Sequence, residues 1–329
     1  MSLLEVSDLR TSFFLRTGEL RVLDGVNIDI DEGEVLGLVG ETGSGKSVTA
    51  YSIIRLLKQP GRIVGGEVRW RGRDLVTLWE SELEQEIRGK EIAMIFQNPR
   101  EALNPVITVG RQLTQVLEIR RGMSKREARQ EAIKIVKSLH ISDPESRLNS
   151  HPHQLSGGMA QRIMISLALS CEPRLLIADE PTTGLDVTTQ YQIVQLLREL
   201  RDRTGMAILI ITHDLALAAQ MCDRVAVLYA GKIAEVGRTE YLFRSPRHPY
   251  TKALLASRPR LGLKGDIVTI PGNVANLMHP PGGCRFHPRC PNALSICSEF
   301  QPPLEQMEPG QLVACHNPVV LHQEAAASG

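Results

Sequence analysis

The feature that most constrains the fold of this chain is a glycine-rich segment near its amino end. Residues 40–47 read G-E-T-G-S-G-K-S, which has the form G-x-x-x-x-G-K-[ST]. Glycines let consecutive backbone N–H groups converge on phosphate oxygens, while Lys46 can reach the β- and γ-phosphates and Ser47 can ligate Mg²⁺. Because an apolar run at 34–39 precedes the loop and an apolar-faced stretch at 47–57 follows it, we expect a strand, a phosphate-binding loop and a helix in that order.

The same glycines do not fit a dinucleotide-binding fingerprint. Gly43 and Gly45 would need a third glycine at position 48, where Val48 stands. We therefore expect a P-loop nucleotidase. The expected contacts to the nucleotide are the loop and the residue after it: Gly40, Glu41, Thr42, Gly43, Ser44, Gly45, Lys46, Ser47 and Val48.

Apolar periodicity along the first 240 residues predicts an α/β fold with a largely parallel sheet. Short apolar runs predict strands at 67–70, 91–96, 175–178 and 207–211, and a hairpin over 224–236 that turns at Ala230-Gly231. Helical spacing dominates from about 110 to 170, where Ser124 and Glu127 have the spacing of a capping box. Alternating strands and helices indicate an α/β core into which a helical subdomain is inserted.

Bulk properties exclude some classes of function. The 38 basic and 37 acidic residues leave a net charge of +1, which gives no electrostatic footprint for nucleic acid. No apolar run approaches the roughly 18 residues of a membrane span, and the amino end does not have the pattern of a signal peptide. We therefore expect a cytoplasmic protein whose membrane role, if it has one, comes through partner subunits.

Two further segments give the chain its family resemblance. Residues 155–162, L-S-G-G-M-A-Q-R, resemble the signature of ATP-binding-cassette (ABC) ATPases, and 175–180, L-L-I-A-D-E, match the acidic strand of that family. The resemblance to an ABC transporter ATPase covers about residues 3–240. It implies a P-loop core with an antiparallel β subdomain and an inserted α-helical subdomain.

The resemblance assigns the catalytic residues. Asp179 is expected to help hold Mg²⁺ and Glu180 to polarise the attacking water as general base. Gln97 is expected to sense Mg²⁺ and the attacking water while it contacts a membrane subunit. The expected Mg²⁺ ligands are therefore Ser47, Gln97 and Asp179. His213 matches the switch histidine that bonds the γ-phosphate.

The resemblance also places residues around the adenine and across a dimer. Phe13 aligns with the aromatic residue that stacks on adenine, although Phe14 is adjacent and either ring could lie in the core. Ser156 can cap a helix beginning at about Gly157, and the free N–H groups of a helix start attract phosphate. We expect the ATP held by a partner subunit to contact Ser156, Gly157, Gly158, Gln161 and Asp186.

Composition changes after about residue 244, where proline becomes frequent and four of the six cysteines occur, which predicts a separate small cysteine-containing module. A cytosolic location disfavours disulfides, and the spacing of Cys284, Cys290, Cys297 and Cys315 lacks the C-x₂-C pairs usual for zinc. Spacing alone leaves an iron–sulfur cluster, zinc and unligated thiols open. Residues 248–255 and 283–291 look like the C-terminal extension of dipeptide/oligopeptide importer ATPases, and in that family the four cysteines can hold a [4Fe–4S] cluster. We therefore expect such a cluster, with zinc as the alternative.

These observations predict three segments: a nucleotide-binding domain over 1–245 with its helical subdomain at about 98–170, an extension over 246–322, and a disordered tail over 323–329. The resemblance implies an ATP-hydrolysing importer subunit for di- or oligopeptides or a related solute such as nickel or glutathione. It implies a related second ATPase in a heterodimer, two transmembrane permeases and, indirectly, a periplasmic or lipid-anchored solute-binding protein, on the cytoplasmic face of the bacterial inner membrane. The competing hypothesis, an ABC ATPase acting on nucleic acid or ribosomes, fits the near-neutral charge poorly.

Overall fold

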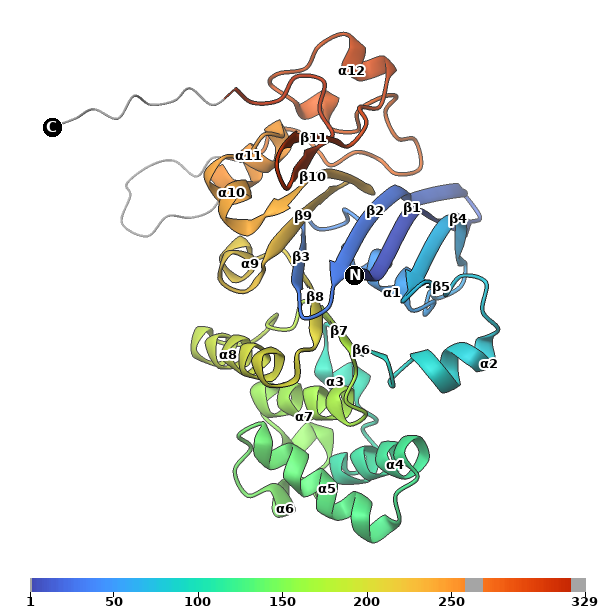
Figure 1. Cartoon of the computed structure of the whole chain (residues 1–329), viewed down its shortest axis with the longest axis vertical. Helices are drawn as coiled ribbons and strands as arrows, with labels where there is room; N and C mark the ends of the chain where they lie inside the picture. Colours follow the sequence, from blue (N-terminus) through green and yellow to red (C-terminus); the bar gives the residue numbers. More distant parts are fainter. Residues whose placement is uncertain (1, 258–268, 321–329) are drawn as a thin grey trace, which may run out of the picture. The chain divides into compact units, whose positions relative to one another are not determined.

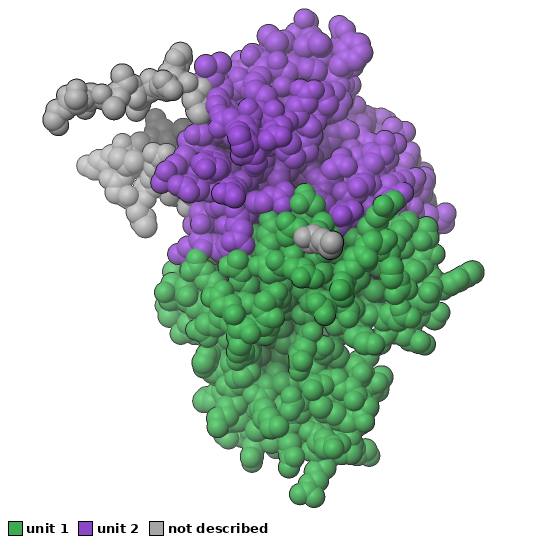
Figure 2. All heavy atoms as spheres, viewed as in Figure 1, with its two compact units in different colours: residues 1–4, 29–35, 69–212 green, residues 5–28, 36–68, 213–329 purple. Residues whose placement is uncertain are grey.

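The computed structural model describes residues 2–257 and 269–320 (Figure 1). It divides into two compact units, coloured separately in Figure 2. Unit 1 comprises residues 1–4, 29–35 and 69–212, and unit 2 comprises 5–28, 36–68 and 213–329. The tail predicted to be disordered, 323–329, lies outside the described residues.

Unit 1 is built on three parallel strands, β6 (Ile92–Ile95), β7 (Leu175–Asp179) and β8 (Ala207–Thr212). In register, β6 pairs with β7 and β7 with β8. Every residue of β7 and β8 is buried, which explains why these strands read as continuous apolar runs rather than alternating ones. Helix α8 (Val187–Thr204) connects β7 to β8 and buries one apolar face.

A helical subdomain follows β6 within unit 1 (Figure 1). Its core contains Leu113, Leu117, Ala132, Val136 and Ile163 among other buried apolar side chains. The predicted capping box is confirmed, because the Ser124 hydroxyl accepts from the Glu127 N–H and the Glu127 carboxylate accepts from the Ser124 N–H. The elements are α3 (Pro99–Ala102), α4 (Val109–Arg121), α5 (Lys125–Ser138), α6 (Pro144–Arg147), the 3₁₀ turn η2 (Pro152–Gln154) and α7 (Gly157–Leu169).

Three short elements complete unit 1 before β6. Strand β5 (Arg73–Asp74) pairs antiparallel with the end of β4 (Gly61–Trp70). Helix α2 (Glu80–Glu82) continues into one π-helical turn, η1 (Leu83–Ile87), whose Leu83 and Ile87 are buried.

Unit 2 contains most of the long amino-terminal strands and the first helix. Strands β1 (Ser2–Leu15) and β2 (Gly18–Asp31) join β4 in the order β2-β1-β4. Helix α1 (Lys46–Ile53) is tied to β1 by a 2.9 Å hydrogen bond between the hydroxyls of Ser52 and Thr11. The helix predicted over 47–57 is therefore shorter than expected. It ends at Ile53 because Arg55, two residues on, has φ 52°, a left-handed conformation that a helix does not continue through.

A second set of strands in unit 2 carries the predicted hairpin. Strand β3 (Val35–Val39), apart from its first residue, pairs parallel with β9 (Arg224–Tyr229), which turns into antiparallel β10 (Lys232–Arg238). Ala230 and Gly231 both have positive φ, as a tight two-residue hairpin turn requires, so the predicted turn is confirmed. The sequence did not indicate β12 (Gln311–Val313) and β11 (Glu305–Glu308), which extend this sheet beyond β10.

The carboxyl-terminal part of unit 2 packs around a cluster of aromatic rings. Phe286 lies 5.1 Å from the Tyr229 ring and 5.3 Å from the Tyr250 ring, and both Phe286 and Tyr250 are buried. The remaining elements are α9 (Leu215–Met221), α10 (Thr239–Arg244), α11 (Pro249–Ala256), the 3₁₀ turn η3 (His287–Arg289) and α12 (Ile296–Glu299). Among the described residues, none of the helices is long and apolar enough to cross a membrane.

Candidate functional site

The phosphate-binding loop of unit 2 connects β3 to α1, in the predicted order of strand, loop and helix. A Cβ atom on Gly40 would lie 2.1 Å from the carbonyl oxygen of Leu228, so only glycine fits at this point of the loop. Gly43 has φ 80° and open space on its exposed side, which leaves room for a ligand to approach the backbone. The loop closes on itself through a 3.2 Å hydrogen bond from the Ser44 N–H to the Glu41 carbonyl.

Two side chains of the loop fit an anionic ligand. The Lys46 ammonium group donates to the carbonyls of Gly40 at 2.8 Å and Glu41 at 2.9 Å, which folds the charge back over the loop. The Ser44 hydroxyl is buried and has no hydrogen-bond partner among the described residues. Buried hydroxyls are normally satisfied, and a bound phosphate oxygen would supply the missing partner. The donor set thus fits a polyphosphate.

The acidic strand of unit 1 ends in a hydrogen-bonded cluster around Glu180. Its Oε2 atom accepts from the Gln97 amide at 2.9 Å and from the Thr183 hydroxyl at 2.9 Å. Glu180 has φ 47°, a left-handed conformation that costs energy for a residue with a side chain and is concentrated at functional sites. Asp179, the last residue of β7, is 1% exposed. The structure therefore brings together Gln97 and Glu180, two of the three residues predicted to act in catalysis.

The third predicted catalytic residue, His213, lies in unit 2. It follows Thr212, the last residue of β8, and its side chain is exposed. Asp214, the next residue, caps α9 by accepting from the N–H groups of Ala216 and Leu217. His213 therefore stands in the short segment between a buried strand and a capped helix.

The signature segment begins α7 as expected. The Ser156 hydroxyl caps the helix by accepting from the Met159 N–H at 3.3 Å. Ser156 is exposed and Gly157 and Gly158 are half-buried, whereas Gln161 is 2% exposed. The helix start thus presents Ser156 and the two glycines, while Gln161 lies behind them in the interior of unit 1.

Asp186 lies close to the signature. As the cap of α8, its carboxylate accepts from the Thr189 N–H at 2.9 Å and from the Thr189 hydroxyl at 2.7 Å. These hydrogen bonds lower the pKa of Asp186. A Cβ on Gly158 would meet the Thr189 methyl at 2.6 Å, so the start of the signature helix and the first turn of α8 pack directly on one another within unit 1.

The two candidate adenine-stacking rings are adjacent on β1. Phe13 is half-buried, and its ring lies over Gly61, where a Cβ would come within 2.8 Å of it. Phe14 is 47% exposed, with the Arg62 guanidinium 5.9 Å from the ring centre. The role of Phe13 at adenine stays a prediction.

The families that this chain matches are consistent with the phosphate-binding loop and the acidic strand described above. Residues 23–183 match the family model described as "ABC transporter", and residues 234–297 match the model "Oligopeptide/dipeptide transporter, C-terminal region". A probable peptide ABC transporter ATP-binding protein, y4tR of Sinorhizobium fredii, is 50% identical over 95% of this chain and 94% of its own length. The chain belongs to the ATP-binding proteins of peptide ABC transporters. It is accordingly an ATPase, and the predicted fold class is confirmed.

Other members of this family and one solved structure show the same relationship. The oligopeptide transport ATP-binding protein OppD of Salmonella typhimurium is 48% identical over 96% of this chain and 94% of its own length. The dipeptide transport ATP-binding protein DppD of Escherichia coli is 43% identical over 97% of this chain and 98% of its own. A dimeric post-hydrolysis state of the ATP-binding cassette MJ0796, bound to ADP and Pi, superposes with a TM-score of 0.65 and 29% identity, and covers 72% of this chain and 98% of that one.

The expectation of a [4Fe–4S] cluster, and of zinc as its alternative, is wrong. Within the described residues, which include all four cysteines, no group of three or more His, Cys, Asp or Glu side chains could hold a metal ion, and the relatives are named simply as ATP-binding proteins. In the metal-free chain, burial raises the pKa of Cys284 and Cys290, and raises that of Cys315 to about 11. The Cys297 sulfur accepts a hydrogen bond from the Leu294 N–H.

A separate cysteine-containing module is likewise not confirmed for this ABC ATPase. The segment that carries these cysteines packs into unit 2 through Phe286 and through Arg285, which is paired with Asp24 of β2 at 2.8 Å. The domain boundary at 245 stays a prediction.

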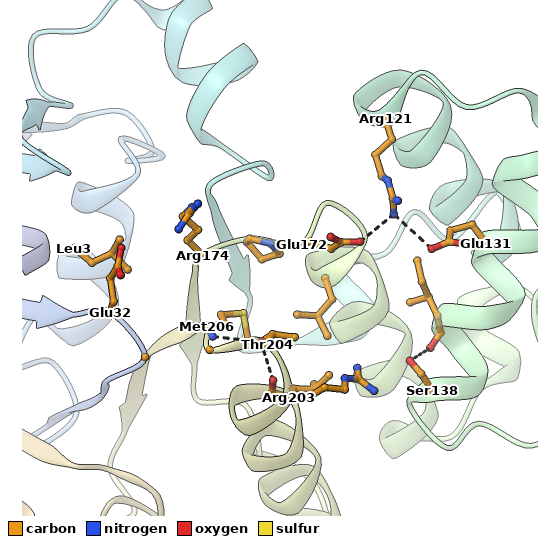
Figure 3. A pocket seen from close by; sticks show the side chains of 16 residues that line it. Leu3, Glu32, Arg121, Glu131, Ser138, Glu172, Arg174, Arg203, Thr204 and Met206 are labelled. Atoms are coloured by element: carbon orange, nitrogen blue, oxygen red, sulfur yellow. Dashed lines mark hydrogen bonds and ion pairs between the residues drawn. The ribbon is translucent and has the colours of Figure 1, made fainter.

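A cavity of about 570 Å³ lies at the other end of the strands of unit 1 (Figure 3). Arg174 and Met206, which precede β7 and β8, line it together with Arg121, whose guanidinium pairs with Glu131 at 3.5 Å and Glu172 at 3.6 Å. The five residues of β7 span about 16 Å between this cavity and the Asp179-Glu180 end. The cavity is therefore distinct from the Glu180 cluster.

Sequence reasoning missed two residues that touch the phosphate-binding loop. The Arg289 guanidinium pairs with the Glu41 carboxylate at 2.8 and 3.2 Å, and the Glu41 N–H donates to the Tyr250 hydroxyl at 2.9 Å. Both residues lie in the two segments that resemble importer extensions, and this resemblance was the only sequence signal that pointed to them. Nothing in their spacing indicates contact with a loop more than 200 residues away.

Proposed function

We propose that this chain is the ATP-hydrolysing subunit that drives import of di- or oligopeptides, or of a related solute. The match of both the cassette and the C-terminal region to peptide transporters supports the peptide branch. An ATP-binding subunit of a peptide ABC transporter works with transmembrane permeases. We further propose two permeases, a related second ATPase, a solute-binding protein outside the membrane, and a peripheral position on the cytoplasmic face of the inner membrane.

The observation that carries the hydrolytic role is the Glu180 carboxylate held by Gln97 and Thr183. In the proposed reaction a water oxygen bonds to the γ-phosphorus as the bond from that phosphorus to the bridging oxygen breaks. Glu180 accepts the proton of the attacking water, and ADP leaves. Because two donors fix its Oε2 atom, the carboxylate needs little reorganisation before it acts.

The other predicted residues are proposed to hold the nucleotide. Residues 40–48 surround the phosphates, and His213 bonds the γ-phosphate. The oxygens of Ser47, Gln97 and Asp179 are the ligand type that Mg²⁺ prefers, and the ion would neutralise phosphate charge. Because the Gln97 amide nitrogen donates to Glu180, its amide oxygen would be the atom available to a bound Mg²⁺.

The exposed signature supports a second ATPase. Ser156, Gly157 and Gly158 form a helix start with free N–H groups, which suits the γ-phosphate of an ATP bound to a partner subunit. Asp186 and Gln161 complete the proposed set, Gln161 from its buried position on α7.

Glu180→Gln tests the catalytic proposal. The amide cannot accept the proton, so we expect ATP binding to be retained, the closed dimer to accumulate and turnover to be abolished. The matched control is Glu172→Gln, since Glu172 is exposed at the opposite end of β7 and should leave turnover unchanged. Normal hydrolysis by Glu180→Gln would show that Glu180 is not the base.

A tagged pull-down from membranes of the native host tests the partners. Mass spectrometry should identify a second ATPase and two multi-span permeases. Recovery of ribosomal or DNA-bound proteins without any membrane protein would instead support an ABC ATPase that acts on nucleic acid or ribosomes.

A further inference from the structure

We propose that Arg289 and Tyr250, near the carboxyl end, are positioning residues that hold the phosphate-binding loop at Glu41 and so set the affinity for ATP. The inference rests on the ATP-binding role of this loop and adds two residues that the loop motif does not contain. All the contacts concerned lie within unit 2.

The first contact is a partly buried, two-point ion pair. Arg289 Nη1 lies 2.8 Å from Glu41 Oε2, and Arg289 Nη2 lies 3.2 Å from Glu41 Oε1. The Arg289 side chain is 5% exposed and that of Glu41 24%. Parallel hydrogen bonds between a guanidinium and a carboxylate fix orientation as well as distance, and they are stronger when water is excluded. Glu41 therefore has one preferred position.

Arg289 is itself held by further contacts, so it can keep the Glu41 side chain in this position. Its guanidinium also donates to the carbonyls of Pro271 at 2.8 Å and Ile270 at 3.2 Å, and lies 5.7 Å from the centre of the Tyr229 ring. Burial alone would lower the pKa of Arg289, but the hydrogen bonds to Glu41 and Tyr229 outweigh it and raise the pKa. The group stays charged at every physiological pH.

The second contact fixes the backbone of the same residue. The Glu41 N–H donates to the Tyr250 hydroxyl at 2.9 Å, while the Glu41 carbonyl accepts from the Lys46 ammonium group. Tyr250 is fully buried in the aromatic cluster, with its ring 4.6 Å from that of Tyr229. Glu41 is thus held by its side chain, its N–H and its carbonyl, and the last of these links it to the lysine that meets the phosphates.

Preorganisation explains why this arrangement should affect binding. A loop that already has the shape of its bound form loses less conformational entropy when the ligand arrives. Replacing Arg289 would also leave the Glu41 carboxylate partly buried without its ion-pair partner, and the carboxylate would turn toward water and take the loop with it. We expect the dissociation constant for ATP to rise about tenfold, the change produced by 1.4 kcal/mol.

The experiment is equilibrium binding of ATP to the full chain. Arg289→Met should raise the dissociation constant about tenfold while changing kcat at saturating ATP less than twofold, and Arg289→Lys, which keeps the charge, should give an intermediate value. Tyr250→Phe removes only the hydroxyl and should cause a smaller rise, which keeps the test available if Arg289→Met does not fold. The control is Arg247→Met, because the Arg247 guanidinium pairs with Glu308 and donates to the Val319 carbonyl, which are both outside the phosphate-binding loop.

A double-mutant cycle with Glu41→Gln separates positioning from general destabilisation. If Arg289 acts through Glu41, the effect of Glu41→Gln should shrink toward onefold in the Arg289→Met background. Additive effects, unchanged affinity in folded Arg289→Met, or an equal loss in Arg247→Met would overturn the inference. Failure of the unmodified chain to bind ATP would instead contradict the proposed function.

Discussion

The packing between the signature helix and α8 gives a quantitative prediction for Gly158→Ala. The new Cβ would lie 2.6 Å from the Thr189 methyl carbon, whereas carbon atoms in good contact are about 3.5–4.0 Å apart. The methyl must therefore retreat by about 1 Å. Thr189 cannot easily rotate away, because its hydroxyl and its N–H both donate to Asp186.

Overpacking of this kind typically costs about 1–3 kcal/mol, against which alanine returns up to about 1 kcal/mol of helix propensity. A matched control separates the two effects. Gly157→Ala has the same gain in propensity but meets only the tip of Leu185 at 3.2 Å, a flexible side chain that can move by a few tenths of an ångström. Because the propensity gain cancels, we expect the free energy of unfolding, measured by urea titration, to be about 1–3 kcal/mol lower for Gly158→Ala than for Gly157→Ala.

Thr189→Ser provides the rescue. Serine lacks the clashing methyl but keeps the hydroxyl that bonds Asp186, so the double variant Gly158→Ala/Thr189→Ser should recover most of the lost stability. Equal stability of the two alanine variants, or no rescue by serine, would refute the packing argument.

Two further predictions concern stability. Burial lowers the pKa of His248 from 6.5 to about 4, so the stabilising contribution of neutral His248 is complete above pH 6.5 and is lost as the pH falls toward 4, by up to about 3 kcal/mol. His248→Asn can keep the hydrogen bond from the Tyr250 N–H without titrating. The melting temperature of this variant should therefore fall less steeply between pH 6.5 and pH 4 than that of the unmodified chain. Equal slopes of melting temperature against pH would exclude His248 as the cause. Leu113→Ala, in the core of the helical subdomain, should lower the free energy of unfolding by about 2–5 kcal/mol. Ile119→Ala, on the exposed side of the same helix, should change it by less than about 0.5 kcal/mol. Similar values for the two variants would mean that Leu113 is not a core residue.

Local sequence signals determined much of the cassette. The order of strand, loop and helix around Lys46 follows from short-range geometry, since glycines and a following helix start are needed wherever backbone N–H groups must converge on phosphate. The capping box at Ser124 and the turn at Ala230-Gly231 depend on hydrogen bonds and dihedral angles within a few residues, so the sequence alone predicts them.

Contacts between distant segments could not be predicted in this way. Cysteine spacing allowed a metal cluster, but ligation depends on how the folded chain arranges the sulfur atoms, and the arrangement in the described residues could not hold a metal ion. The sequence likewise gave no means of pairing Arg289 with Glu41, which lie 248 residues apart. Motifs determined by local backbone chemistry can be read from the sequence of this protein. The partners of a buried charge were decided by the tertiary structure, because only the packed chain determines which opposite charge shares its water-free surroundings.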